Sequence, residues 1–178
     1  MATEKIEILD SDGISRALTR IAHEILEKNK GVENLVLVGI RTGGAYLAAQ
    51  LQQKISEIEG QLVPLGSIDV TMYRDDLSSR NNLAVGQTSI NFSVTDRSVV
   101  LIDDVLFTGR TIRSALDALI DLGRPRNIQL AILIDRGHRE LPIRPDYIGR
   151  NLPTARNEQI EVDFNPQHQA QAVHLIRT

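Results

Sequence analysis

Residues 99–111, Val-Val-Leu-Ile-Asp-Asp-Val-Leu-Phe-Thr-Gly-Arg-Thr, constrain the fold and the chemistry of this chain more than any other segment. Four apolar residues are typical of a buried strand, and the carboxylates of Asp103 and Asp104 follow at its end. A turn with glycine and hydroxyl groups then leads into a helical pattern. Because ligands bind at the carboxyl ends of strands in open α/β sheets, we expect a binding crevice here.

The turn after the two carboxylates has the features of a phosphate site. Its backbone N–H groups, the hydroxyls of Thr108 and Thr111 and the N-terminus of the following helix can all donate to an anion. Paired acids suit sugar hydroxyls and a hydrated divalent cation better than a second phosphate. A purely structural strand–turn–helix is a poor alternative, because two ionised neighbours at a buried strand end repel each other. The segment therefore predicts a sugar-phosphate site.

A second strand–turn–helix pattern occurs at residues 38–44, Val-Gly-Ile-Arg-Thr-Gly-Gly. Alone it is weak evidence, since many such turns contain glycine. Glycines let backbone amides approach an anion closely, and Arg41 offers a fork of donors. Beside the 99–111 segment, this turn predicts a second anion site that includes Thr42 and Gly43.

Length and composition exclude several classes of protein. The chain has 178 residues, 42% of them hydrophobic and 24% charged, which predicts one globular domain over residues 1–178. A net charge of −3 and only 3% aromatic residues argue against a general nucleic-acid binder. There is no cysteine, no signal-peptide pattern and no apolar run long enough for a membrane span. We therefore expect a cytoplasmic protein without membrane contact.

Strand and helix patterns alternate along the chain, which predicts an α/β fold with a single doubly wound, mainly parallel sheet. Helices are expected from Asp12 as N-cap to about Asn29, from the 41–44 turn to about Gly60, and from Thr111 to about Leu122. Strands are expected at 5–9, 35–40, 62–63, 67–73, 90–94, 98–103, 129–134 and about 160–164. The polar residues 74–88 predict a long loop at the tip of a hairpin.

The acid pair 103–104 followed by residues 108–111 resembles the phosphoribosyl-pyrophosphate signature of type I phosphoribosyltransferases. Segments 16–24, 71–77 and 135–144 resemble, more specifically, the family of bifunctional pyrimidine-operon attenuation regulators and uracil phosphoribosyltransferases. The resemblance implies the type I phosphoribosyltransferase fold with a small hood and a flexible hairpin loop. It also implies conversion of uracil and phosphoribosyl pyrophosphate to UMP and pyrophosphate with Mg²⁺, in a homodimer or higher homo-oligomer.

The resemblance assigns roles to individual residues. Asp103 and Asp104 would hold ribose hydroxyls and Mg²⁺, while Arg41 and Arg74 would neutralise the departing pyrophosphate. The expected substrate-binding residues are Thr42, Gly43, Tyr73, Val105, Phe107, Thr108, Gly109, Arg110, Thr111, Asp135 and Arg136. Family members often carry a second basic residue where this chain has Gly43, so we expect weaker pyrophosphate binding here, which a Gly43→Arg variant would tighten.

The choice of base is indicated by Phe107. Purine-specific relatives commonly place an acid immediately before the Thr-Gly pair, and a phenyl ring cannot accept a proton from a purine. This favours uracil, with Asp135 and Arg136 lining the base pocket. Two alternatives stay open: a purine-salvage phosphoribosyltransferase, and a nucleotide-sensing RNA regulator with little catalysis.

Two locally basic segments indicate RNA binding in spite of the acidic composition. One is the face of the first helix opposite its apolar stripe, and the other is the stretch 136–150. The resemblance implies that these positions contact the leader of a pyrimidine-operon mRNA, with binding promoted by UMP. They are Arg16, Thr19, Arg20 and His23 on the helix, and Arg139, Arg144 and Arg150 beyond it. A solvated helix face is the alternative interpretation.

Overall fold

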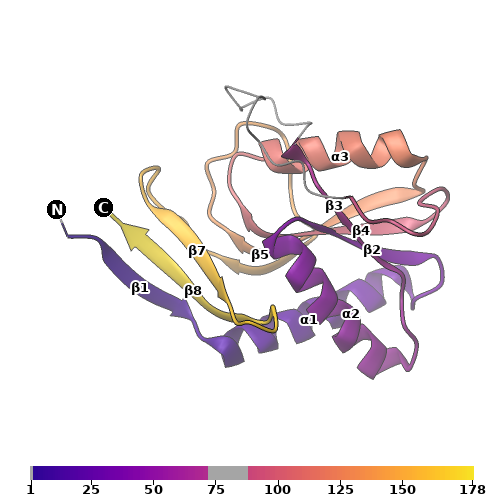
Figure 1. Cartoon of the computed structure of the whole chain (residues 1–178), viewed down its shortest axis with the longest axis horizontal. Helices are drawn as coiled ribbons and strands as arrows, with labels where there is room; N and C mark the ends of the chain where they lie inside the picture. Colours follow the sequence, from indigo (N-terminus) through magenta and orange to yellow (C-terminus); the bar gives the residue numbers. More distant parts are fainter. Residues whose placement is uncertain (1, 72–87) are drawn as a thin grey trace.

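A parallel five-stranded sheet forms the centre of the computed structural model, which describes residues 2–71 and 88–178 (Figure 1). Its strand order is β3-β2-β4-β5-β6, and all four neighbouring pairs are parallel. The strands are β2 (Leu35–Ile40), β3 (Leu65–Ile68), β4 (Ser98–Leu106), β5 (Asn127–Asp135) and β6 (Tyr147–Asn151). The α/β class and the parallel sheet are confirmed.

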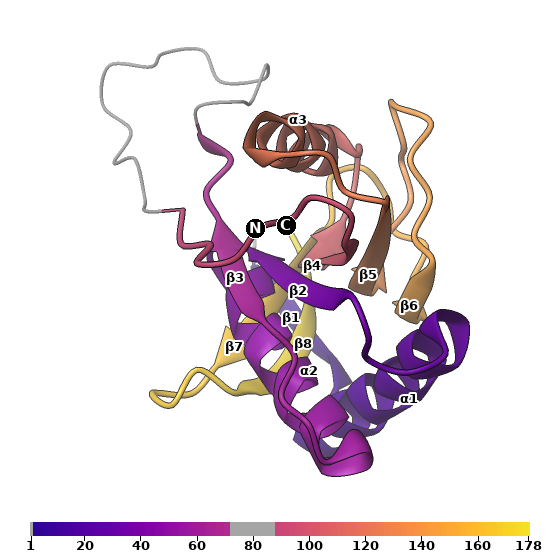
Figure 2. The same ribbon diagram turned by 90° about the vertical axis from the view of Figure 1, so that its right-hand side faces the viewer.

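Helices cover both faces of this sheet. Figure 2 shows α1 (Ser11–Asn29) and α2 (Gly43–Glu59) on one face and α3 (Arg110–Leu122) on the other. In β4, Val100 and Ile102 join the core under α1 and α2, whereas Val99 and Leu101 join the core under α3. Because both faces of the strand are buried, its sequence is a continuous apolar run instead of an alternating one.

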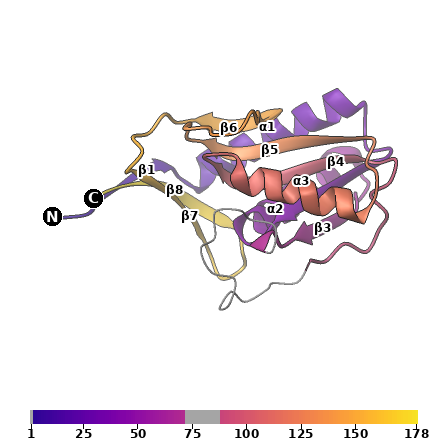
Figure 3. The same ribbon diagram turned by 90° about the horizontal axis from the view of Figure 1, so that it is seen from above.

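A second, antiparallel sheet of three strands lies at one end of the molecule (Figures 1 and 3). It consists of β1 (Glu4–Leu9), β8 (Ala170–Arg177) and β7 (Gln159–Phe164) in the order β1-β8-β7. The chain between β7 and β8 returns to α2, where Gln50 Oε1 accepts the Ala170 N–H at 3.0 Å. This sheet is the small hood that the family resemblance implied.

The helix predictions are confirmed within two residues, with one change at the first N-terminus. The N-cap of α1 is Asp10, not Asp12, and its carboxylate accepts the Gly13 N–H at 2.7 Å. Asp12 lies in the first turn, where its charge favours the positive end of the helix. Residue 30 ends the helix in the left-handed conformation, one residue before the predicted stop at Gly31.

Two strand predictions are wrong. Residues 62–63 form no strand, because the Val63 carbonyl accepts from the side chain of Gln52 on α2 at 2.7 Å. Residues 90–94 form none either, and the expected hairpin is represented by a single bridge between Ser67 and Ser89. The predicted 67–73 strand is also wrong in its bounds, because β3 begins at Leu65 and ends at Ile68, and residues 69–71 are not in a strand. Its last two residues and the loop predicted over 74–88 lie almost wholly outside the described residues. Strands β6 and β8 were not predicted.

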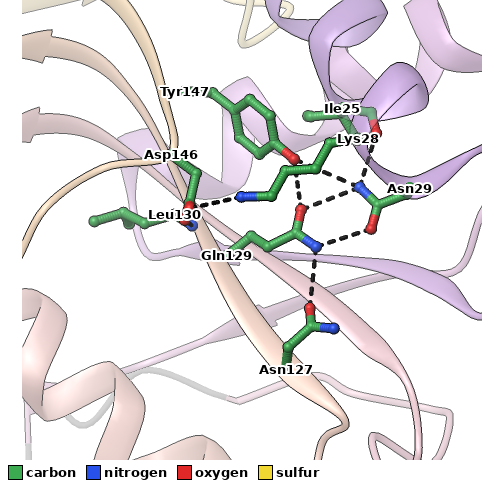
Figure 4. A network of polar contacts seen from close by, with 8 residues as sticks. All are labelled: Ile25, Lys28, Asn29, Asn127, Gln129, Leu130, Asp146 and Tyr147. Carbon is green, nitrogen blue, oxygen red and sulfur yellow. Dashed lines mark hydrogen bonds and ion pairs between the residues drawn. The ribbon is translucent and has the colours of Figure 1, made fainter.

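A buried polar network fastens the end of α1 to β5 and β6 (Figure 4). The Tyr147 hydroxyl donates to Gln129 Oε1 at 2.6 Å, and Asn29 exchanges two hydrogen bonds with the same amide, at 3.0 and 2.8 Å. Gln129 is only 6% exposed, so these bonds satisfy polar atoms that burial would otherwise leave unpaired. Burial also raises the pKa of Tyr147 to about 12. No helix in the described part of the chain could span a membrane.

Candidate functional site

The two carboxylates lie where the sheet divides. From β2 the chain crosses through α2 to β3 on one side, and from β4 it crosses through α3 to β5 on the other. Strand β2 stops pairing with β4 at Ile102, whereas β4 continues beside β5 as far as Leu106. Asp103 and Asp104 therefore stand just beyond the last β2–β4 pair, at the switch point where open α/β sheets bind ligands.

Local hydrogen bonds fix the acid pair. Asp103 Oδ1 accepts the Asp104 N–H at 2.9 Å, and Asp104 Oδ1 accepts the Val105 N–H at 2.8 Å. Asp103 is 8% exposed and Asp104 is half-buried. Strand β4 extends three residues beyond the predicted end at Asp103, so the pair belongs to a rigid strand and not to the turn.

Residues 107–111, for which the sequence predicts a phosphate site and which we name the phosphate loop, join β4 to α3 and border a cavity of about 370 Å³. Gly109 has a φ of +94°, a conformation that favours glycine. Thr108 Oγ1 accepts the Arg110 N–H at 3.3 Å, which holds its hydroxyl in the loop. Predicted substrate residues Val105, Phe107, Thr108, Gly109, Arg110 and Thr111 all line this cavity.

Two helices begin at the crevice, and both N-termini suit an anion. Among the described residues, no side chain caps α2 at Thr42 or α3 at Gly109, and neither first turn carries an acid. The N-terminus of α1, by contrast, is capped by Asp10 and has Asp12 in its first turn. Apart from the Arg110 N–H, which donates to Thr108 Oγ1, the first N–H groups and the dipoles of α2 and α3 can interact with a bound anion such as phosphate.

Residues 41–44, which are predicted to bind pyrophosphate and which we name the pyrophosphate loop, pack directly against the acid pair. A Cβ atom on Gly43 would overlap Asp104 Oδ2, and one on Gly44 would overlap the Ile102 carbonyl. These glycines are therefore required for contact with β4, a role that the sequence analysis did not assign to them. A Gly43→Arg substitution would displace Asp104 as well as add charge, so it cannot test pyrophosphate affinity alone. Arg41 and Thr42 are exposed beside them.

Three rings connect the hood to the pyrophosphate loop. Tyr46, on the first turn of α2, stacks on His168 at 4.2 Å and meets Phe164 edge-on at 5.1 Å. Phe164 in turn lies within contact distance of a Cβ built on Gly43. The sequence analysis missed these residues; the position of Tyr46, three residues after Gly43 at helical spacing, is the signal that could have identified one of them.

Arg136, which is predicted to line the nucleobase pocket, is buried, and its side chain already donates hydrogen bonds within the chain. Its guanidinium stacks over the Phe107 ring at 4.0 Å, and it donates to Thr154 Oγ1 at 3.0 Å and to the Ala155 carbonyl at 3.1 Å. Desolvation lowers the pKa of Arg136, although Glu158 opposes that shift. Asp135 and Arg136 line a hollow of about 430 Å³ at the carboxyl ends of β5 and β6.

The predicted RNA-binding residues divide into two groups. Arg16, Thr19, Arg20 and His23 line one hollow on α1, and Arg150 lines an adjoining hollow with Arg16 and Arg20. These five residues form the α1 basic surface. Arg20 also donates to two β6 carbonyls, at 3.1 and 2.7 Å.

The other predicted residues lie elsewhere. Arg139 points into the candidate site, where it donates to the Phe107 carbonyl and to Asp135. Arg144 is exposed on the same segment. Tyr73 and Arg74 lie outside the described residues.

Comparisons with known proteins agree with this geometry. The phosphoribosyl transferase domain family matches residues 6–169. "Bifunctional protein PyrR" from Geobacter sp. (strain M21) is 62% identical over 169 residues, covering 94% of this chain and 96% of the relative. The protein of the same name from Deinococcus radiodurans is 56% identical over 176 residues, covering 98% and 96%.

Solved structures support the fold. A hypoxanthine phosphoribosyltransferase from Trypanosoma cruzi superimposes with a TM-score of 0.73 at 20% identity, covering 97% of this chain and 91% of that one. One from Staphylococcus aureus gives a TM-score of 0.67 at 22% identity, covering 83% and 77%. The sequence relatives and the shared fold together show that this chain belongs to the phosphoribosyl transferase family, in the group of the bifunctional PyrR proteins.

Proposed function

We propose that this protein transfers the ribose 5-phosphate group of phosphoribosyl pyrophosphate to uracil, giving UMP and pyrophosphate. One observation carries the proposal: an acid pair at the switch point of the sheet stands between two uncapped helix N-termini. A phosphorylated sugar diphosphate needs two anion sites with a hydroxyl-binding group between them, and the crevice supplies these parts in that order.

Separate groups of residues have separate roles in this reaction. The phosphate loop holds the 5′-phosphate through its N–H groups and through the hydroxyls of Thr108 and Thr111. Asp103 and Asp104 accept from the ribose hydroxyls. The bond from the anomeric carbon to pyrophosphate breaks while the bond to the base nitrogen forms, and the proton released from that nitrogen passes to the leaving pyrophosphate. Positive charge develops on the sugar and negative charge on the leaving group in the transition state. The N-terminus of α2 and Arg41 stabilise the leaving pyrophosphate. Arg74 keeps its predicted role in neutralising the pyrophosphate and Tyr73 its predicted role in substrate binding; both lie outside the described residues.

The donor set fits a Mg²⁺ ion that is brought by the substrate. No cluster of three or more His, Cys, Asp or Glu residues that could hold a metal occurs in 2–71 and 88–178. Mg²⁺ commonly binds one or two carboxylates and completes its shell with waters and substrate phosphates, which the acid pair and a diphosphate supply. Bound there, the ion would neutralise charge on the pyrophosphate, and Asp103 and Asp104 would hold it through water or directly.

Uracil is favoured over a purine because Phe107 occupies the position that would otherwise carry an acid. Its ring packs against the guanidinium of Arg136 and edge-on against His138, at 5.7 Å between centroids. The Phe107 ring suits a small, flat base and, unlike an acid at this position, offers no proton acceptor. The purine-salvage alternative predicts turnover with hypoxanthine, so parallel assays with uracil, hypoxanthine and orotate separate the two.

A second function is favoured by the α1 basic surface: UMP-promoted binding of a pyrimidine-operon mRNA leader by a homo-oligomer of this chain. Arg16, Arg20 and Arg150 come from elements far apart in sequence and line one hollow. Filter retention of labelled leader RNA, with and without UMP, tests this function. A chain that retains RNA but shows no turnover with any base would be a nucleotide-sensing regulator with little catalysis.

A further inference from the structure

Segment 136–144, which we name the wrapping segment, encloses the phosphate loop. The Thr108 carbonyl accepts the Glu140 N–H at 2.9 Å and the Leu141 N–H at 3.3 Å. Arg110 pairs with Glu140 at 3.1 Å, and Ile143 packs over Gly109. Each contact joins a residue of the proposed phosphate site to a residue of the wrapping segment. These contacts link the wrapping segment directly to the phosphate loop.

Arg139, in the wrapping segment, joins three parts of the chain. Its Nη1 donates to the Phe107 carbonyl at 2.9 Å, its Nη2 to Asp135 Oδ2 at 2.6 Å, and its Nε to the Ile143 carbonyl at 2.9 Å. Phe107 belongs to the phosphate loop, Asp135 ends β5 at the base side, and Ile143 belongs to the wrapping segment. A planar guanidinium is suited to three fixed acceptors in this way, whereas a lysine ammonium is not.

Breaking the ion pair between Arg139 and Asp135 should be destabilising, because both side chains are largely buried. The side chain of Arg139 is 24% exposed and that of Asp135 is 12% exposed, so removal of the cation leaves a largely buried carboxylate without its counter-charge. All three guanidinium nitrogens already have an acceptor within the chain. Arg139 is therefore poorly placed for the direct RNA contact that the sequence analysis assigned to it.

We propose that Arg139 is a positioning residue that holds the phosphate loop and the base-side Asp135 in register and transmits nucleotide binding to the wrapping segment. The inference rests on the proposed function, since it names how the nucleotide site and RNA binding are linked. Nucleotide contacts at residues 107–111 would fix Phe107, and through Arg139 they would fix residues 139–143 and the adjoining Arg144. By reciprocity, RNA bound at this segment would tighten UMP by the same factor that UMP tightens RNA.

Two substitutions of Arg139 distinguish a role in positioning the phosphate loop from a direct contact with RNA. Arg139→Met removes the charge and all three donors, and Arg139→Lys keeps the charge but loses the fork. A direct contact with an RNA phosphate would be largely restored by lysine, because a point charge suffices there. Three acceptors on three segments would not be satisfied by lysine, so both variants should behave alike if Arg139 positions the loop.

Four quantities are measured for each folded variant: the KM for uracil, kcat, and RNA affinity with and without saturating UMP. Arg124→Met serves as a charge-matched control in the α3–β5 connection, at the opposite ends of the strands. Arg144→Met serves as the comparison for a direct contact, because it is exposed on the wrapping segment. Thermal unfolding confirms that each variant is folded, and Arg139→Lys remains informative if Arg139→Met does not fold.

We expect both Arg139 variants to raise the uracil KM by about tenfold or more and to reduce the UMP enhancement of RNA affinity towards one. RNA affinity without UMP should change by less than about threefold. Arg144→Met should lower RNA affinity at least as much with UMP as without it. An unchanged uracil KM with an RNA affinity that falls equally in both conditions, and that lysine restores, would overturn the proposal. Failure of the wild type to turn over uracil or to bind RNA would instead refute the proposed function.

Discussion

Gly43 lies so close to the carboxylate of Asp104 that a Cβ atom at position 43 would overlap Asp104 Oδ2. One residue belongs to the proposed pyrophosphate loop and the other to the acid pair, so a single contact sets the distance between two parts of the site. Phe164 of the hood also lies within van der Waals distance of that Cβ position. The Asp104 carboxylate therefore occupies space that any side chain at position 43 would need.

A Gly43→Ala variant tests this relationship. The added methyl group must displace the Asp104 carboxylate, and misplacement of a catalytic group by about 1 Å can cost on the order of 100-fold in rate. We expect kcat/KM for phosphoribosyl pyrophosphate to fall by about tenfold to 100-fold. The control is Gly60→Ala at the end of α2, where nothing lies within 4 Å of a built Cβ atom and only the left-handed backbone is strained. Equal activity in the two variants would contradict the assignment.

Substitutions of Arg16 and Arg20, two neighbouring arginines of the α1 basic surface, should differ in their effect on the free energy of unfolding, although both should weaken RNA binding. Arg20 donates to the carbonyls of Ile148 and Gly149, so Arg20→Ala should lower the free energy of unfolding by about 1–2 kcal/mol. Arg16→Ala should leave it within about 0.5 kcal/mol, because Arg16 is exposed. Each should lower RNA affinity and reduce the log–log salt slope by roughly 0.7–0.9 per lost phosphate contact. Urea unfolding measures the free energy of unfolding, and filter binding at several salt concentrations measures RNA affinity. An unchanged salt slope in both variants would show that the α1 basic surface does not contact RNA phosphates.

The buried network at the end of α1 predicts how the free energy of unfolding changes at alkaline pH. Burial raises the pKa of Tyr147 from 10.0 to about 12, so the folded state favours the neutral phenol. Its contribution to stability is complete below pH 10 and is lost as the pH rises from 10 towards 12. Tyr147→Phe should cost about 1 kcal/mol at pH 7, through the lost bond to Gln129, and should flatten the decline in unfolding free energy above pH 10.

Tyr46→Phe is the matched control for that measurement, because it keeps the ring contacts with Phe164 and His168. Urea unfolding at pH 7, 10 and 11 follows both variants and the wild type. A decline above pH 10 that is as steep in Tyr147→Phe as in the wild type would show that another group is responsible.

Local patterns predicted the elements that position the site. The apolar runs of β2, β4 and β5 are continuous because both faces are buried, and α1 has apolar residues at helical spacing, so these elements could be read directly from the sequence. Strand β6 could not: it is a short edge strand with the sequence Tyr-Ile-Gly-Arg-Asn, and its existence depends on pairing with β5. Long-range pairing also determines β8, which holds β1 and β7 together.

The location of the candidate site was predictable from residue type and order alone, because the structure places Asp103, Asp104 and residues 107–111 at one edge of the sheet. Contacts between distant segments were not predictable. The sequence shows Arg139 in a basic stretch, and only the fold reveals that its donors reach Phe107 and Asp135. The glycines at 43 and 44 were expected to admit a pyrophosphate, whereas their packing against β4 appears only once the strands are placed side by side.

The central claim is tested most directly by measuring UMP formation from labelled uracil, phosphoribosyl pyrophosphate and Mg²⁺, with hypoxanthine and orotate in parallel and Asp104→Asn as the variant. We expect turnover with uracil alone and a loss of about 100-fold or more in kcat for the variant, because its amide no longer supplies the negative charge that the oxocarbenium-like transition state and Mg²⁺ require. Thermal unfolding of Asp104→Asn should match the wild type within a few degrees. Turnover with hypoxanthine instead of uracil, or full activity in Asp104→Asn, would contradict the account.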